Sequence, residues 1–181
     1  MNKTGQNDGL FYLIRGINIL LKVHRNNLCL CANSKEWNDR YYGWHTPYFP
    51  PEYQRCCLNS RNFTPNMSCD LYMFFIKYYI WVTGSHLKVN FQRNKSWIED
   101  FLISTEEWVP EIQDAVIDLI SLCINRDPDR RIQSASELVK EKSFLLLEEQ
   151  TGRCDFEEET FEIRSIDTAD KWRWKDVFLF D

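Results

Sequence analysis

The most apolar stretch of the chain lies near its middle, at residues 70–84 (DLYMFFIKYYIWVTG), where Lys77 is the one charge inside the run. A helix that is apolar on all sides belongs in a protein core or in a membrane. Because crossing a bilayer takes about 20 apolar residues, this shorter run predicts a buried central helix. Asp70 suits the N-cap of that helix, and Gly84 suits the C-terminal position that favours a positive φ.

Helical patterns dominate the second half of the chain. Residues 96–102 predict a short helix, and residues 110–125 predict an amphipathic helix that has a proline near its start. Ser134 followed by Glu137 is typical of a capping box, so another helix is expected to run from there to Lys142. The apolar face of the amphipathic helix is formed by Ile112, Val116, Leu119, Ile120 and Cys123.

The N-terminal part is less regular. Residues 1–9 are polar and predict a disordered start, whereas residues 9–21 are apolar and fit either the end of a helix or a strand. The short apolar runs at residues 18–23 and 28–31 predict a small β-hairpin. The prolines within residues 46–52 are expected to exclude regular structure there.

Composition narrows the class of protein. With 181 residues and 44% apolar content, the chain can form one core, which we place at residues 10–147, followed by an acidic extension at residues 148–181. The formal charge is −5 and no block of five basic residues occurs, so a dedicated nucleic-acid binder is not expected. The polar start and seven cysteines favour a reduced, cytoplasmic setting, and no metal or other cofactor is expected.

Three segments carry recognisable motifs in a fixed order. Residues 46–52 read TPYFPPE, residues 70–84 begin with Asp70 and end in Thr-Gly, and residues 125–138 read NRDPDRRIQSASEL. In this order they resemble the end of the activation segment, the F helix and the D-P-x-x-R segment of the C-terminal lobe of eukaryotic-type protein kinases. The resemblance implies a mainly α, kinase-like C-lobe, with the hairpin near the N-terminus as its one β element.

The same resemblance assigns structural roles to matched residues. It implies that Glu52 forms an ion pair with Arg131, and a charge of either kind would be costly to bury alone. It also implies that Asp70 accepts N–H bonds from the catalytic loop and braces that loop. The other matched motif residues are Thr46, Asp127 and Pro128.

The catalytic loop of the family, H-R-D-x-K-x-x-N, can be aligned in three ways. Residues 11–18 can be laid over it, which puts Leu13 at the position of the catalytic Asp. Alternatively the loop is deleted before Asn18, an alignment favoured by the flanking sequences GLFYLIRGI and NILL. Finally, residues 23–26 (VHRN) match V-H-R-D, with Asn26 at the position of the Asp.

None of these alignments supplies the catalytic carboxylate. The Asp-Phe-Gly motif, whose Asp holds Mg²⁺, would fall at Ala32, Asn33 and Ser34, which include no acid. The Gly-rich loop and the strand lysine of the N-terminal lobe have no counterpart in the sequence either. The resemblance therefore implies a lobe without catalytic activity.

The function expected from this resemblance is protein binding by an inactive, pseudokinase-like C-lobe, acting as a decoy or inhibitor of a cellular kinase. The alternative is a truncated Ser/Thr protein kinase that binds ATP and phosphorylates proteins. A protein partner, with kinases among the candidates, is expected, whereas nucleic acid, membrane and nucleotide are not.

Overall fold

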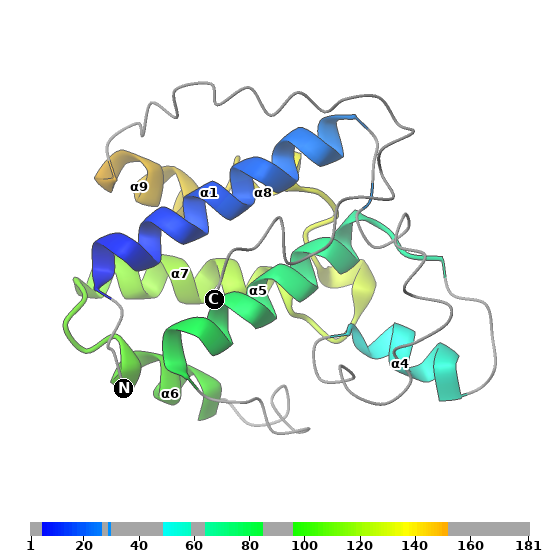
Figure 1. Cartoon of the computed structure of the whole chain (residues 1–181), viewed down its shortest axis with the longest axis horizontal. Coiled ribbons are helices and arrows are strands. Elements are labelled where there is room, and N and C mark those ends of the chain that lie inside the picture. Colours follow the sequence, from blue (N-terminus) through cyan, green and yellow to red (C-terminus); the bar gives the residue numbers. More distant parts are fainter. Residues whose placement is uncertain (1–4, 27–28, 30–48, 59–63, 85–95, 152–181) are drawn as a thin grey trace.

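The computed structural model describes residues 5–26, 29, 49–58, 64–84 and 96–151 (Figure 1). Within these ranges the regular structure is helical and no residue belongs to a strand, so the expected mainly α class is confirmed. The helices are α1 (Gln6–Arg25), α4 (Pro51–Leu58), α5 (Met67–Thr83), α6 (Ser96–Ser104), α7 (Pro110–Cys123), the 3₁₀ turn η2 (Pro128–Arg130), α8 (Ala135–Leu138) and α9 (Lys142–Gln150).

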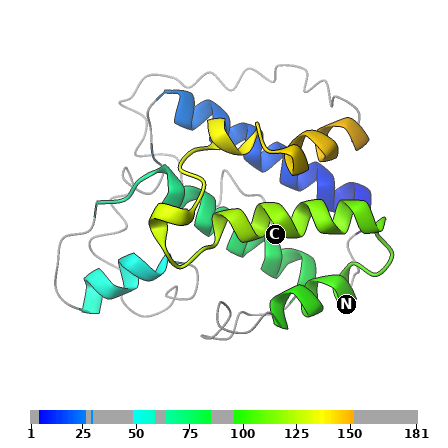
Figure 2. The ribbon, with the colours of Figure 1, turned by 180° about the vertical axis from the view of Figure 1, so that it is seen from behind.

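Helix α5 is the centre of the fold, as its all-round apolar sequence predicts. Thirteen of its 17 residues are buried. Helices α1 and α7 both pack against it, and α6 follows its C-terminal end. Seen from behind, α7 lies in front of α5, while α4 stands apart from these helices (Figure 2). The apolar side chains of α5 are thus buried against α1, α6 and α7.

Two glycines allow α1 to come close to its neighbours. A Cβ atom at Gly16 would collide with the ring of Phe74 on α5, and one at Gly9 would collide with Trp108. Where the helices meet near Gly9, the hydroxyl of Tyr78 donates a hydrogen bond to the Gly9 carbonyl at 3.1 Å. Because glycine has no side chain, α1 can lie this close to Phe74 of α5 and to Trp108.

The ends of α5 differ in how well the sequence predicts them. Gly84 has φ 64° and its N–H donates to Ile80 O, as expected of a glycine C-cap. The start was placed wrongly: Asn66 is the N-cap and accepts the Cys69 N–H at 3.2 Å. Asp70 lies inside the helix and is fully buried. Its carboxylate is tolerated there because it has a hydrogen-bond partner from another segment.

The expected β-hairpin is wrong. Residues 18–23 lie within α1, because buried side chains at Leu10, Leu13, Ile17 and Leu20 recur every three or four residues and form one helical face. Of the second run, only Cys29 is among the described residues. Helix α1 also begins at Gln6, inside the segment predicted to be disordered.

Two further helix boundaries differ from those predicted from the sequence. Helix α4 begins at Pro51, inside the proline-rich segment for which no regular structure was expected. Proline is tolerated there because the first helical N–H has no partner within the helix anyway. The helix predicted from Ser134 to Lys142 is interrupted: α8 ends at Leu138 and α9 begins at Lys142.

The remaining helix predictions agree with the structure. Helices α6 and α7 lie where the pattern placed them, and Ser134 accepts the Glu137 N–H at 3.3 Å. The Glu137 carboxylate, however, accepts the N–H of Gln133, one residue before the expected donor. Beyond α9, almost all of the acidic extension lies outside the described residues. None of the described helices has the length and apolar character needed to cross a membrane.

Candidate functional site

The N-terminal half of α5 gathers buried polar side chains from segments far apart in the sequence. We call this cluster the α5 junction. It brings together residues from α1, α4, α5 and the segment between α7 and α8. Its members are His24, Cys29, Glu52, Cys69, Asp70, Tyr72 and Arg131.

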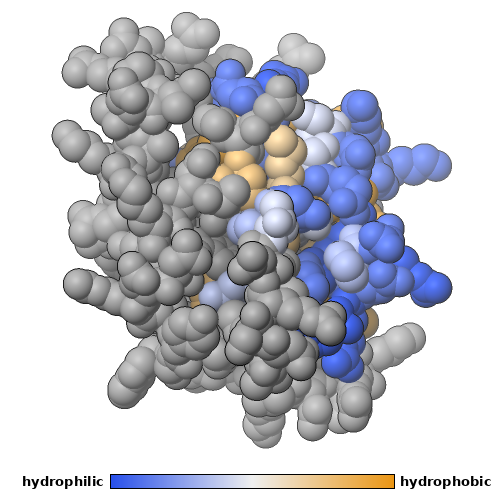
Figure 3. Space-filling model, turned by 90° about the vertical axis from the view of Figure 1, so that its right-hand side faces the viewer, coloured by the Kyte–Doolittle hydropathy of each residue, from blue (hydrophilic) through white to orange (hydrophobic). Residues whose placement is uncertain are grey.

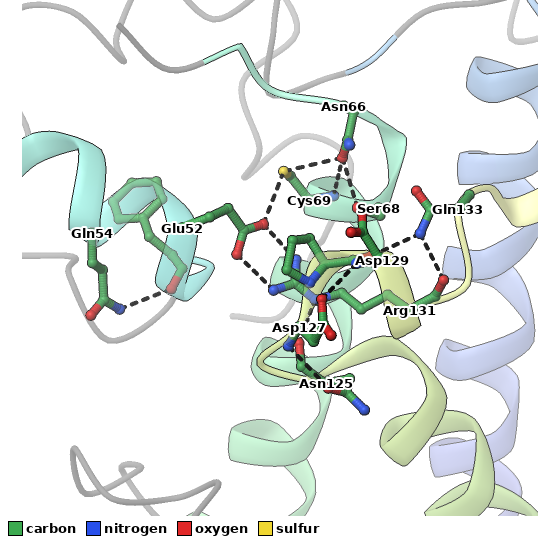
Figure 4. A network of polar contacts seen from close by, with 12 residues as sticks. Glu52, Gln54, Asn66, Ser68, Cys69, Asn125, Asp127, Asp129, Arg131 and Gln133 are labelled. Carbon is green, nitrogen blue, oxygen red and sulfur yellow. Dashed lines mark hydrogen bonds and ion pairs between the residues drawn. The ribbon is translucent and has the colours of Figure 1, made fainter. Parts of the chain in front are cut away.

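The strongest contact in the junction is the ion pair between Arg131 and Glu52. The two terminal guanidinium nitrogens of Arg131 donate to the two carboxylate oxygens of Glu52, at 2.6 and 2.7 Å (Figure 4). Arg131 is only 4% exposed. Its Nε donates to Asn125 O at 2.5 Å, and its guanidinium lies 4.8 Å from the ring centroid of Tyr72. This pair is the one that the kinase resemblance implies, and bidentate geometry makes it both strong and directional.

Local sequence fixes the position of Arg131. Pro128 begins η2, and the Asp127 side chain caps it by accepting the Asp129 N–H at 3.2 Å. The amide of Gln133 donates to the carbonyl of Arg131 at 2.8 Å (Figure 4). The D-P-D-R-R stretch is thus a closed turn that holds the guanidinium against α4 and α5.

The second contact in the junction joins α1, α5 and α8 through one imidazole ring. His24 Nδ1 accepts the backbone N–H of Ala135 at 2.9 Å, so the neutral ring carries its proton on Nε2. Nε2 lies 3.2 Å from Oδ2 of Asp70 and donates to it, and both side chains are fully buried. The other Asp70 oxygen lies 3.6 Å from the thiol of Cys29.

The thiols of Cys69, in the junction, and of Cys123, outside it, are not poised for nucleophilic chemistry. Burial raises the pKa of Cys69 to about 12, helped by the negative charge of Glu52 and opposed by the hydrogen bond at Asn66. Its Sγ lies 3.3 Å from the side-chain oxygen of Asn66. Burial also raises the pKa of Cys123 well above its ordinary value. Both are neutral thiols at pH 7, and thiolate is the reactive form.

The residues aligned with the catalytic loop do not meet at the junction. Leu13 is in the core face of α1, and Asn18 is half-buried within the same helix. Asn26 follows the last turn of α1, where its side-chain amide donates to Lys22 O at 2.8 Å. Thr46 lies outside the described residues, as do the positions aligned with Asp-Phe-Gly, which are Ala32, Asn33 and Ser34.

Sequence reasoning did not assign His24, Cys29, Cys69 or Tyr72 to the site. A signal for His24 was present in the VHRN stretch, since the resemblance implies that Asp70 accepts hydrogen bonds from such a loop. Nothing in the sequence marks Tyr72 as the ring beneath Arg131.

The described residues include no group of three His, Cys, Asp or Glu that could hold a metal ion. No protein-family model, curated protein or solved structure matches this chain.

Proposed function

We propose that the chain is a protein-kinase-like C-lobe without catalytic activity that acts by binding another protein. The observation that carries the proposal is the ion pair between Glu52 and Arg131. These residues are 79 positions apart, in two segments that each resemble a kinase motif. A chance resemblance of two short stretches gives no reason for their charged residues to meet in a bidentate pair.

The surroundings of Asp70 support the same reading. In the family the corresponding aspartate accepts hydrogen bonds from the catalytic loop. Here it accepts one from His24, which belongs to the VHRN stretch. We therefore adopt the alignment of VHRN with V-H-R-D. The other two alignments lay loop or strand residues over the interior of α1, which is a continuous helix from Gln6 to Arg25.

With this alignment, Asn26 stands where the family has its catalytic base. A carboxamide cannot take the proton of a substrate hydroxyl as a carboxylate does, and general-base catalysis is worth about 10²- to 10⁴-fold in rate. The Asn26 amide is instead bonded to the end of α1. This environment supports a binding role over phosphoryl transfer. Free thiols at Cys29, Cys69 and Cys123 fit the cytoplasmic setting in which such a partner would be met.

The alternative is a truncated Ser/Thr kinase that binds ATP. A thermal-shift assay of the full chain with Mg-ATP distinguishes it from this proposal. A ligand present at 100 times its Kd stabilises the folded state by about 2.7 kcal/mol. For a chain of this size, each kcal/mol shifts Tm by about 2–4 °C. We expect no shift, and a rise of several degrees would favour the alternative.

The binding role itself is tested by titrating the full chain into a panel of purified protein kinases. Peptide phosphorylation and direct binding are both recorded. We expect at least one kinase to bind the chain and to lose activity. The matched variants are Arg131→Ala, which opens the α5 junction, and Arg130→Ala, which leaves it intact; only the first should lose inhibition. A panel in which no kinase binds and none is inhibited would refute the proposal.

A further inference from the structure

Large apolar side chains are exposed at the end of α6 and at the N-cap of α7, on either side of the turn that joins these helices. Ile103 is 68% exposed, Val109 49% and Leu102 38%. A single exposed apolar residue is ordinary, but several exposed apolar residues in one region of the chain are a candidate interaction site. We call Leu102, Ile103 and Val109, with the exposed carboxylates of Glu99, Glu111 and Asp114, the corner surface.

The corner surface has a fixed backbone beneath it. The buried amide of Gln113 donates to Thr105 O at 2.6 Å, and the Thr105 hydroxyl donates to Phe101 O at 2.7 Å. The N–H of Val109 donates to the side-chain oxygen of Gln6 at 2.8 Å, which ties the turn to the start of α1. A binding surface built on such a turn loses little conformational entropy when a partner docks.

The chain segment that contains this turn carries charge of a single sign. From Trp97 to Cys123 the chain contains seven acidic residues and no lysine or arginine. All seven acidic side chains are exposed. They are Glu99, Asp100, Glu106, Glu107, Glu111, Asp114 and Asp118.

We propose that the corner surface is a docking site for a basic amphipathic segment of a partner protein. Its apolar side chains would cover Leu102, Ile103 and Val109, while its Lys and Arg residues would meet the surrounding carboxylates. Complementary charge of this kind raises the association rate and excludes acidic partners. The inference rests on the proposed binding function and adds to it the place and the chemistry of the partner.

Charge also argues against a second copy of this chain as the occupant. In a two-fold symmetric dimer the same patch faces itself. The exposed carboxylates of one corner surface would then lie opposite those of the other, at a cost in repulsion.

The corner surface is separate from the α5 junction. Figure 1 shows the turn between α6 and α7 at the opposite end of the molecule from α4, which supplies Glu52 to the junction. The coloured part of the surface on the α4 side is largely hydrophilic, with a smaller apolar area in the upper part of the view (Figure 3). Substitutions at the corner surface therefore leave the junction untouched.

The test uses the full chain and two synthetic helical peptides labelled with fluorescein. One has leucines at helical spacing with lysine elsewhere, and the other has glutamate in place of every lysine. Fluorescence anisotropy should show the lysine peptide binding at least roughly tenfold more tightly, with weaker binding at high salt because exposed charges are screened. Equal binding of the two peptides would overturn the proposal.

Matched variants locate the binding. Two double variants should each weaken binding of the lysine peptide by roughly tenfold or more. One combines I103S with V109S, and the other combines E111K with D114K. Leu145→Ser alters a leucine of α9 that is as exposed as Val109, and Asp129→Lys reverses a charge in η2; both should leave affinity unchanged. Because every altered side chain is exposed, circular dichroism should show intact folding. Equal loss in the control variants would contradict the proposed location.

Other occupants give distinct results. If sedimentation velocity shows a dimer that I103S and V109S dissociate, the occupant is a second copy and the proposal fails. A double variant, K171E with R173E, tests the chain's own basic stretch at residues 171–175. If the wild type binds no peptide and this variant does, that stretch is the occupant and the proposal fails again. No kinase or nucleotide is present in these assays, so their failure is separate from a failure of the proposed function.

Discussion

His24 on α1 and Asp70 on α5 meet in a fully buried contact, 3.2 Å from Nε2 to Oδ2. Since the other ring nitrogen accepts the Ala135 N–H, one imidazole connects three helices that are far apart in the sequence. Removing either side chain takes a hydrogen-bond partner away from polar groups in a place that water does not reach. This is the condition under which a hydrogen bond matters most to stability.

We therefore expect strong coupling between His24 and Asp70. Asp70→Ala should lower the free energy of unfolding by about 3 kcal/mol or more, and His24→Ala by about 2–3 kcal/mol. The double variant should cost at least about 1 kcal/mol less than the sum, because the contact between the two side chains is already lost in each single variant. Urea unfolding followed by tryptophan fluorescence measures all three values. Additivity within about 0.5 kcal/mol would show that the contact does not act as a unit.

Neighbouring arginines should differ sharply in importance. Arg131→Ala leaves Glu52 without its bidentate partner and is expected to cost about 3–5 kcal/mol, as for other broken buried pairs. Arg130→Ala serves as the control, because Arg130 has a 77% exposed side chain and pairs with Asp127 at the surface. Its cost should lie within about 0.5 kcal/mol of zero. Equal effects of the two substitutions in chemical denaturation would argue against a buried ion pair.

Gly16→Ala should destabilise the protein although alanine is the better helix former. Alanine in place of glycine favours a helix by about 1 kcal/mol in the absence of other contacts. Here the added methyl group would collide with the Phe74 ring, and overpacking costs about 1–3 kcal/mol. We expect a net fall in Tm. Gly5→Ala is the matched control, since a Cβ there has no neighbour within 4 Å; a rise in Tm for Gly16→Ala would mean that α1 lies farther from α5.

Stability should fall under alkaline conditions. Burial raises the pKa of Cys69 from 9.0 to about 12, and burial, with the charge of Asp100, raises that of Tyr79 from 10.0 to about 12. Tyr78, which is fully buried, is shifted upward for the same reason. Below pH 9 these groups are neutral in both states, so their full contribution is present. Above that the unfolded chain loses protons first, and stability is lost as pH rises towards 12.

This decline can be measured by urea unfolding at several pH values between 7 and 11. The variant Tyr78→Phe should show a shallower decline, because it removes one of the groups that ionise in the unfolded state. At pH 7 the same variant should be about 1–2 kcal/mol less stable, since the Gly9 carbonyl loses its donor. A free energy of unfolding that is flat up to pH 11 would contradict the burial of these groups.

The sequence alone determined the helices whose patterns admit one interpretation. The run at residues 70–84 is apolar on all sides and too short to cross a membrane, which predicts a place in the core. The face from Ile112 to Cys123 repeats at helical spacing for about three turns. Gly84 ends α5 because a positive φ is needed there and only glycine adopts it without strain. The kinase resemblance also implied the pairing of Glu52 with Arg131, because the matched residues pair with each other in that family.

Tertiary structure decided the features for which local pattern is ambiguous. Residues 18–23 form a short apolar run that fits a strand as well as a helix, and the adjoining face from Leu10 to Leu20 packs against α5 as one helix. Asp70 at the start of an apolar run suits a helix cap. It became a buried acceptor because Asn66 caps the helix first and His24 arrives from a distant segment to satisfy the carboxylate. Such contacts join segments tens of residues apart, so no local pattern contains them.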